Sequence, residues 1–66
     1  MTHAIHCAIN QGIDAARIAG KDADSPYHNC HPMFRYWWEA LVMKYDDRDK
    51  SESCVRKAVL QRVKVK

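Results

Sequence analysis

Residues 11–20, Gln-Gly-Ile-Asp-Ala-Ala-Arg-Ile-Ala-Gly, decide the fold of this chain. They form a helical pattern of small residues, and two further signals follow it. Residues 25–27 read Ser-Pro-Tyr, and residues 37–40 read Trp-Trp-Glu-Ala. A small-residue helix, a Pro-Tyr loop and a Trp-bearing second helix are typical of a helical hairpin that docks on something larger. They are not typical of a catalytic apparatus.

The first helix is expected over residues 3–19. Thr2 is the expected N-cap, because its hydroxyl can accept a hydrogen bond from an early backbone N–H. Apolar and small residues recur at a spacing of three to four and therefore share one helix face. These residues are Ile5, Ile9, Gly12 or Ile13, Ala16 and Ala19.

The two glycines have different expected roles. Gly20 is expected directly after the helix, because glycine enters the left-handed region without a steric penalty. Gly12 lies inside the helix, where it costs roughly 1 kcal/mol relative to alanine. That loss indicates close approach of another backbone or of a bulky ring, and a tryptophan of the second helix is the expected neighbour.

A linker over residues 20–31 is expected to join the first two helices. It is polar and longer than most helix–helix connections. Pro26 disfavours a helical conformation at the residue before it. We expect Tyr27 to fold inward and close the open end of the hairpin.

The second helix is expected over residues 32–46, with Pro32 as its first residue, where the missing N–H needs no partner. Trp37 and Trp38 lie about 100° apart on a helix, so they cannot both enter the core. One is expected to pack on the first helix, and the other to form an exposed aromatic anchor for a partner. The apolar stripe is expected to comprise Met33 or Phe34, one of the two tryptophans, Leu41 and Tyr45.

A third helix is expected over residues 51–64. Asp49 and Glu52 resemble a capping box with Asp in the Ser/Thr position. The valines at 55, 59 and 63 share one face, and basic residues flank them. The sequence therefore predicts an all-α fold, with a two-helix hairpin, a long Pro-Tyr linker and a third, basic C-terminal helix in one small domain, residues 1–66.

Length and composition limit the functional classes. At 66 residues the core is marginal, since such a chain buries only about 60% of its unfolded surface. The chain has no apolar run near the length of a membrane span. It also lacks the pattern of a secretory signal, so a cytoplasmic location is expected. Three widely spaced cysteines are expected to be reduced thiols rather than a disulfide framework.

Charge is divided unevenly along the sequence. Residues 1–49 hold five Lys/Arg and seven Asp/Glu, for a net charge of −2. Residues 50–66 hold six Lys/Arg and one Asp/Glu, for a net charge of +5. Only the C-terminal segment has the charge expected of a phosphate-binding surface.

Residues 8–45 resemble the ribosome modulation factor family of short bacterial, phage and plasmid proteins. Its members look like A-x-x-x-G-x-x-A-x-x-x-G, then Cys-Pro-Tyr, where this chain has Ser-Pro-Tyr, then a Trp-bearing helix. The matching positions are Gly12, Ala15 or Ala16, Gly20, Pro26, Tyr27, Trp37, Glu39 and Ala40. The resemblance implies two helices joined by a linker. It also implies binding to ribosomal RNA and proteins without catalysis.

Five histidine and cysteine side chains raise the alternative of a zinc-stabilised module. Structural zinc takes four N or S donors in a tetrahedron. The candidates are His3, Cys7, His28, Cys30 and His31. The standard finger spacings are absent, and about 25 Å of helix separates His3 from the linker. Ordinary surface or half-buried side chains are therefore the favoured interpretation, and no metal or cofactor is expected.

An enzyme is not expected. Cys30 and His31 are adjacent, so their side chains diverge, and no Gly-rich or oxyanion-binding frame surrounds them. A nucleotide-binding Gly-Lys-Ser/Thr loop is also absent. We therefore expect neither catalysis nor a small-molecule substrate.

The sequence thus favours a small modulator that binds a macromolecule and not a membrane. The first expectation is a ribosome- or RNA-binding protein, with basic residues contacting phosphates and aromatic rings stacking on bases. The alternative is a phage-type inhibitor of a host or CRISPR defence complex, and a homodimer through the aromatic edge and the valine stripe is also possible. The expected contact residues are Tyr36, Trp37, Trp38, Arg56, Lys57, Arg62 and Lys64.

Overall fold

The computed structural model describes residues 3–63 and contains three α-helices. Helix α1 spans His3–Ile18, α2 spans Pro32–Asp46 and α3 spans Glu52–Val63. A short 3-10 helix, η1, covers Gly20–Asp22 within the linker. No strand occurs in this part of the chain, which confirms the all-α prediction. The expected cap at Thr2 lies outside the described residues.

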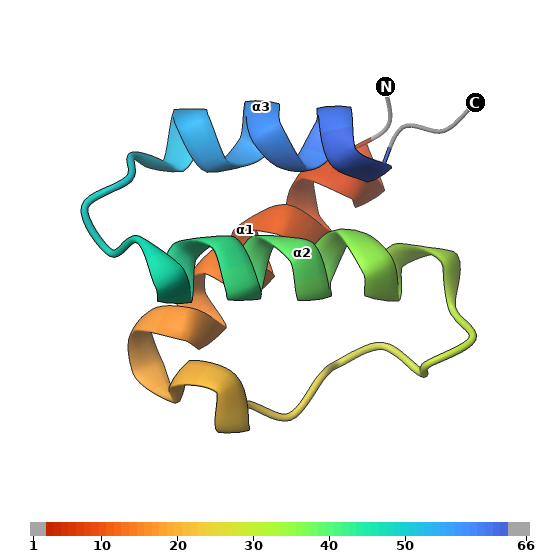
Figure 1. Ribbon diagram of the computed structural model, residues 1–66. Helices are drawn as coiled ribbons and strands as arrows, with labels where there is room; N and C mark the ends of the chain where they lie inside the picture. The colour runs from red at the N-terminus through yellow and green to blue at the C-terminus, as the bar shows by residue number, and fades with distance from the viewer. Residues whose placement is uncertain (1–2, 64–66) are drawn as a thin grey trace.

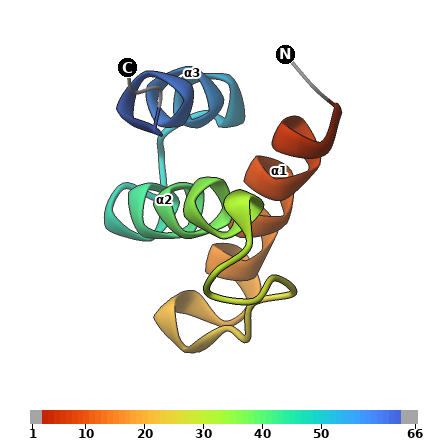
Figure 2. The ribbon, with the colours of Figure 1, turned by 90° about the vertical axis from the view of Figure 1, so that its right-hand side faces the viewer.

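Helices α2 and α3 run antiparallel, one above the other, and α1 crosses behind both (Figures 1 and 2). The segment after η1 runs back beneath α2 and reaches Pro32, the first residue of α2 (Figure 1). The predicted hairpin and third helix are both present. Helix α2 is the central element, because it packs against α1 on one side and against α3 on another.

The core consists of two adjoining clusters. One lies where α1, α2 and α3 meet and contains Ile9, Ile13, Ala40, Val55, Val59 and Val63. The other lies between α1 and α2 and contains Ala8, Ala16, Trp37 and Leu41. Tyr27 reaches this second cluster from the linker, as predicted. The valine stripe of α3 is also confirmed as a buried face.

Gly12 marks the closest approach of α1 to α2. A Cβ atom there would collide with the main-chain oxygen of Trp37 and would lie 2.9 Å from the Ala40 Cβ. The sequence predicted close approach, with a tryptophan as the neighbour. The neighbouring atom is in fact the tryptophan's carbonyl oxygen, so the contact is between two backbones and not between a backbone and a ring.

Gly20 ends the helical segment in the left-handed region, with φ +65°. This confirms its predicted role, since an L side chain is strained in that region. A Cβ at Gly20 would also lie 3.2 Å from the ring of Tyr45. The same ring carries the Lys21 ammonium 5.2 Å from its centroid, a cation–π contact. The turn after α1 is thereby packed against the end of α2.

Two positions assigned to the apolar stripes are wrong. Ala19 is exposed, because the chain leaves α1 at Ile18 and turns. Tyr45 is 46% exposed, because the face of α2 that meets α1 continues through Leu41 to Lys44. The inward position in that turn of the helix is therefore filled by a lysine.

Local hydrogen bonds start the second and third helices. His31 precedes Pro32, and its Nδ1 accepts from the Met33 N–H at 3.0 Å. Ser51 precedes α3, and its hydroxyl oxygen accepts from the Cys54 N–H at 3.2 Å. The capping box expected at Asp49 is therefore wrong, since a hydroxyl one residue before the helix satisfies the free N–H directly.

The Gly12 contact predicts the effect of adding one methyl group. We expect Gly12→Ala to lower the free energy of unfolding by about 2 kcal/mol, because overpacking against a backbone atom outweighs the gain in helix propensity of about 1 kcal/mol. Urea denaturation followed by circular dichroism measures the change. Gln11→Ala, at the exposed neighbouring position, is the control. Equal stability of Gly12→Ala and the wild type would refute the backbone contact.

Candidate functional site

The outer face of α2 carries the largest exposed aromatic rings. Trp38 is 40% exposed and Tyr45 is 46% exposed. They are seven residues apart and therefore lie on the same side of the helix. Phe34 lies one turn before Trp38, with the two ring planes within 8° and their centroids 6.4 Å apart. This stack restricts the orientation of the Trp38 ring. We call Phe34, Trp38 and Tyr45 the aromatic face.

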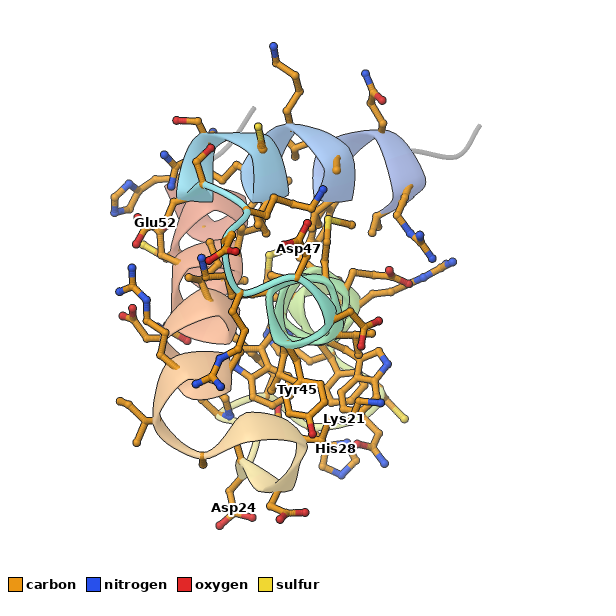
Figure 3. The ribbon with its side chains drawn as sticks, turned by 60° about the vertical axis from the view of Figure 1, so that its left-hand side comes forward. Lys21, Asp24, His28, Tyr45, Asp47 and Glu52 are labelled. Carbon is orange, nitrogen blue, oxygen red and sulfur yellow. The ribbon has the colours of Figure 1, made fainter. Side chains whose placement is uncertain are left out.

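Cationic side chains border the aromatic face. Lys21 contacts the ring of Tyr45, and Arg35 is exposed on α2 three residues before Trp38. Figure 3 shows Lys21 and Tyr45 together on the side of α2 that points away from α3. The aromatic face therefore combines flat apolar rings with positive charge at its edge.

The other two aromatic residues expected in the site lie elsewhere. Trp37 is only 2% exposed and belongs to the core between α1 and α2. Tyr36 is half-buried and packs against both core clusters. Neither ring offers a free face for stacking. The expectation that one tryptophan is inside and one outside is confirmed, with Trp37 inside and Trp38 outside.

Two of the basic residues expected on α3 are bound within the chain. The Arg62 Nε lies 3.0 Å from the Glu39 carboxylate, and the Arg56 guanidinium donates to the Asn10 side-chain oxygen at 2.7 Å. Lys57 is exposed and has no hydrogen bond or ion pair to any residue between 3 and 63. Lys64 lies outside the described residues. Among the basic residues of α3 that were expected to contact phosphate, Lys57 is therefore the one whose side chain has no partner within residues 3–63.

The expected aromatic and basic contacts do not form one surface. Tyr45 of the aromatic face lies on the underside of α2, whereas α3 lies above it (Figure 3). Glu39 separates them further, because its carboxylate holds Arg62 on the α3 side.

The five candidate zinc donors do not converge on one point. His3 Nε2 and Cys7 Sγ pair with each other at 3.2 Å near the start of α1. His28 and His31 each use Nδ1 to accept a backbone N–H within the linker region. The linker lies at the opposite end of α1 from His3 (Figure 2). Among the described residues, no group of three His, Cys, Asp or Glu side chains is placed to hold a metal.

Lys44 is a buried polar group that sequence analysis did not single out. It is 8% exposed, and its Nζ donates to the Arg48 carbonyl at 2.9 Å and to the Lys50 carbonyl at 2.6 Å. These bonds fix the connection between α2 and α3. Its position three residues after Leu41 was the available signal, because that spacing places it on the buried face.

An ion pair fastens the end of α1 to the start of α3. The Arg17 guanidinium lies 2.9 Å from the Glu52 carboxylate and 3.7 Å from that of Asp14. Both Arg17 and Glu52 are about half exposed, so the pair adds little stability on its own. It does orient Arg17 toward the segment that Lys44 anchors.

The two tryptophans are expected to respond oppositely to truncation. Trp37→Ala should remove about 3–5 kcal/mol of stability, because it empties the core. Trp38→Ala should remove only about 1 kcal/mol, the value of one aromatic stack. Thermal and urea denaturation of the two variants test this, with loss of helical circular dichroism as the readout if Trp37→Ala does not fold. Equal destabilisation would show that Trp38 is a core residue and not a surface anchor.

None of the helices in residues 3–63 is both long and apolar enough to cross a membrane. No protein family model, curated protein or solved structure matches this chain.

Proposed function

We propose that this chain is a non-enzymatic binding module that modulates or inhibits a larger protein complex by docking its aromatic face on it. The observation that carries the proposal is the exposed Trp38 ring, held by Phe34 and bordered by Arg35 and Tyr45. Binding hot spots in protein interfaces are enriched in tryptophan, tyrosine and arginine. All three residue types are exposed here on one helix.

The stacking of Trp38 on Phe34 supports a docking role for energetic reasons. Ordering a side chain on binding costs about 0.5–1.5 kcal/mol. A ring that is already held in place loses less freedom when a partner covers it. Tyr45 is restrained in the same way by Lys21 and by the turn at Gly20. The aromatic face is thus pre-organised for contact.

The charge of the described surface favours a protein partner over a nucleic acid. Residues 3–63 hold nine Lys/Arg, the eleven of the whole chain less Lys64 and Lys66, against eight Asp/Glu. Lys44 is buried, and Arg62 and Arg17 are paired with carboxylates. Affinity for a nucleic acid comes largely from cations that neutralise phosphates. A nearly balanced surface supplies little of that attraction.

Ribosome or RNA binding is the second candidate. Two observations favour it: Lys57 and Arg35 are exposed without an acidic partner in the described chain, and the Trp38 ring is available for stacking on an unpaired base. The resemblance to the ribosome modulation factor family points the same way. A homodimer would have to use the aromatic face, since the valine stripe is buried within one chain.

Capture of binding partners from a lysate of the cells that naturally produce the protein separates the two candidate functions. The tagged wild type is compared with Trp38→Ala, with Lys57→Glu and with Gln61→Ala as a control at an exposed position on α3. For a protein partner we expect Trp38→Ala to lose the bound complex. Lys57→Glu and Gln61→Ala should retain it, through high-salt washes and ribonuclease treatment.

The opposite pattern supports the RNA candidate. Release of the bound material by moderate salt and by ribonuclease, together with loss of capture by Lys57→Glu, would show that phosphate contacts provide the affinity. Retention of the complex by Trp38→Ala would contradict the docking role of the aromatic face in either case. Circular dichroism of each variant confirms that it is folded.

A further inference from the structure

Three cationic side chains line one hollow at the junction of the helices. Arg17 comes from the end of α1, Lys44 from α2 and Arg48 from the connection to α3. Ala16 forms the remaining wall, and the hollow has a volume of about 170 Å³. None of the three residues of the aromatic face lines it, so the inference does not depend on the proposed function.

Lys44 is the unusual member of this group. It is 8% exposed, yet both of its hydrogen-bond partners are neutral backbone carbonyls, at 2.9 and 2.6 Å. No carboxylate of residues 3–63 forms an ion pair with it. Burial of a charge is costly unless it is paired. An ammonium group carries three donors, so one N–H remains for a further acceptor.

Arg48 adds a second cation with free donors. Its side chain is exposed and makes no ion pair within the described chain, and its carbonyl oxygen holds Lys44. The hydrogen bond from Lys44 to the Arg48 carbonyl therefore fixes the backbone from which the Arg48 guanidinium extends. A guanidinium offers five N–H donors in a planar fork suited to phosphate oxygens.

Arg17 is the third cation, and the acidic groups of the site lie beside it. Its guanidinium contacts Glu52 at 2.9 Å and Asp14 at 3.7 Å. These carboxylates hold the Arg17 side chain in place and offset part of the local positive charge. Neither Lys44 nor Arg48 forms an ion pair within residues 3–63, although Asp47 and Asp49 flank Arg48 in the sequence.

We propose that Arg17, Lys44 and Arg48 form a binding site for a phosphate-class oxyanion. Donors from three separate elements can approach different oxygens of one tetrahedral group, and charge-assisted hydrogen bonds are about twice as strong as neutral ones. The volume exceeds what a single water needs. The ligand supplies the counter-charge that buried Lys44 lacks.

The first test titrates inorganic phosphate at constant ionic strength against the folded chain, with amide chemical shifts and the melting temperature as readouts. We expect saturable shifts centred on residues 16–17, 44 and 48–50, and a melting temperature that rises with phosphate, because a ligand bound only by the folded state stabilises it. Arg48→Gln should weaken binding by about tenfold to a hundredfold, since it removes a charge-assisted hydrogen bond to the anion. The variant keeps the Arg48 carbonyl that holds Lys44.

Lys57→Gln is the matched control, because it removes one exposed cation of α3 that does not line the hollow. It should bind phosphate as the wild type does. A response that does not saturate, or equal weakening by Arg48→Gln and Lys57→Gln, would overturn the site and indicate general charge attraction.

Two further probes identify the source of the phosphoryl group. A phosphoserine peptide and a single-stranded oligoribonucleotide are titrated separately. The control for the first is the dephosphorylated peptide, and the control for the second is an oligonucleotide with an uncharged methylphosphonate backbone. Tighter binding of one probe than of inorganic phosphate, lost in Arg48→Gln and kept in Lys57→Gln, assigns that source. If neither exceeds inorganic phosphate, the site is for the free ion.

Discussion

The close crossing of α1 over α2 at Gly12 is the contact on which the structure depends. Only a residue without a Cβ lets the two backbones approach at this point, beside the carbonyl of Trp37 and the small side chain of Ala40. The crossing fixes the rotation of α2 about its axis. Trp37 then enters the core, and Trp38, about 100° further round, must face solvent. The position of the aromatic face is therefore a consequence of a glycine on another helix.

Local rules predicted the elements of this fold well. Pro32 and the polar residues after Asp46 set the limits of α2, the glycine at position 20 ended the first helix, and the valine spacing gave the buried face of α3. These features depend on neighbouring residues alone. The start of α3 shows where local rules fail: Asp49 and Ser51 are both acceptable caps, and the path of the connection, held by Lys44, selects Ser51.

The candidate site was harder to predict because sequence charge differs from available surface charge. Residues 50–66 carry a net charge of +5, yet Arg62 is paired with Glu39 on α2 and Arg56 is hydrogen-bonded to Asn10 on α1. Such partners lie far away in the sequence, and no periodicity reveals them. The same limit applies to Lys44, whose burial requires the crossing of α1 as well as its position on the α2 stripe.

Three sides of helix α2 have different surroundings. One side packs on α1 through Trp37 and Leu41, a second meets α3 and holds Arg62 through Glu39, and the third presents Trp38 to solvent. A chain of 66 residues can build only a small hydrophobic core. An exposed tryptophan is apolar surface area that folding does not bury. Burying such a ring would contribute several times the stability of a surface contact, so the rotation of α2 that places Trp37 in the core leaves the contribution of Trp38 only partly used.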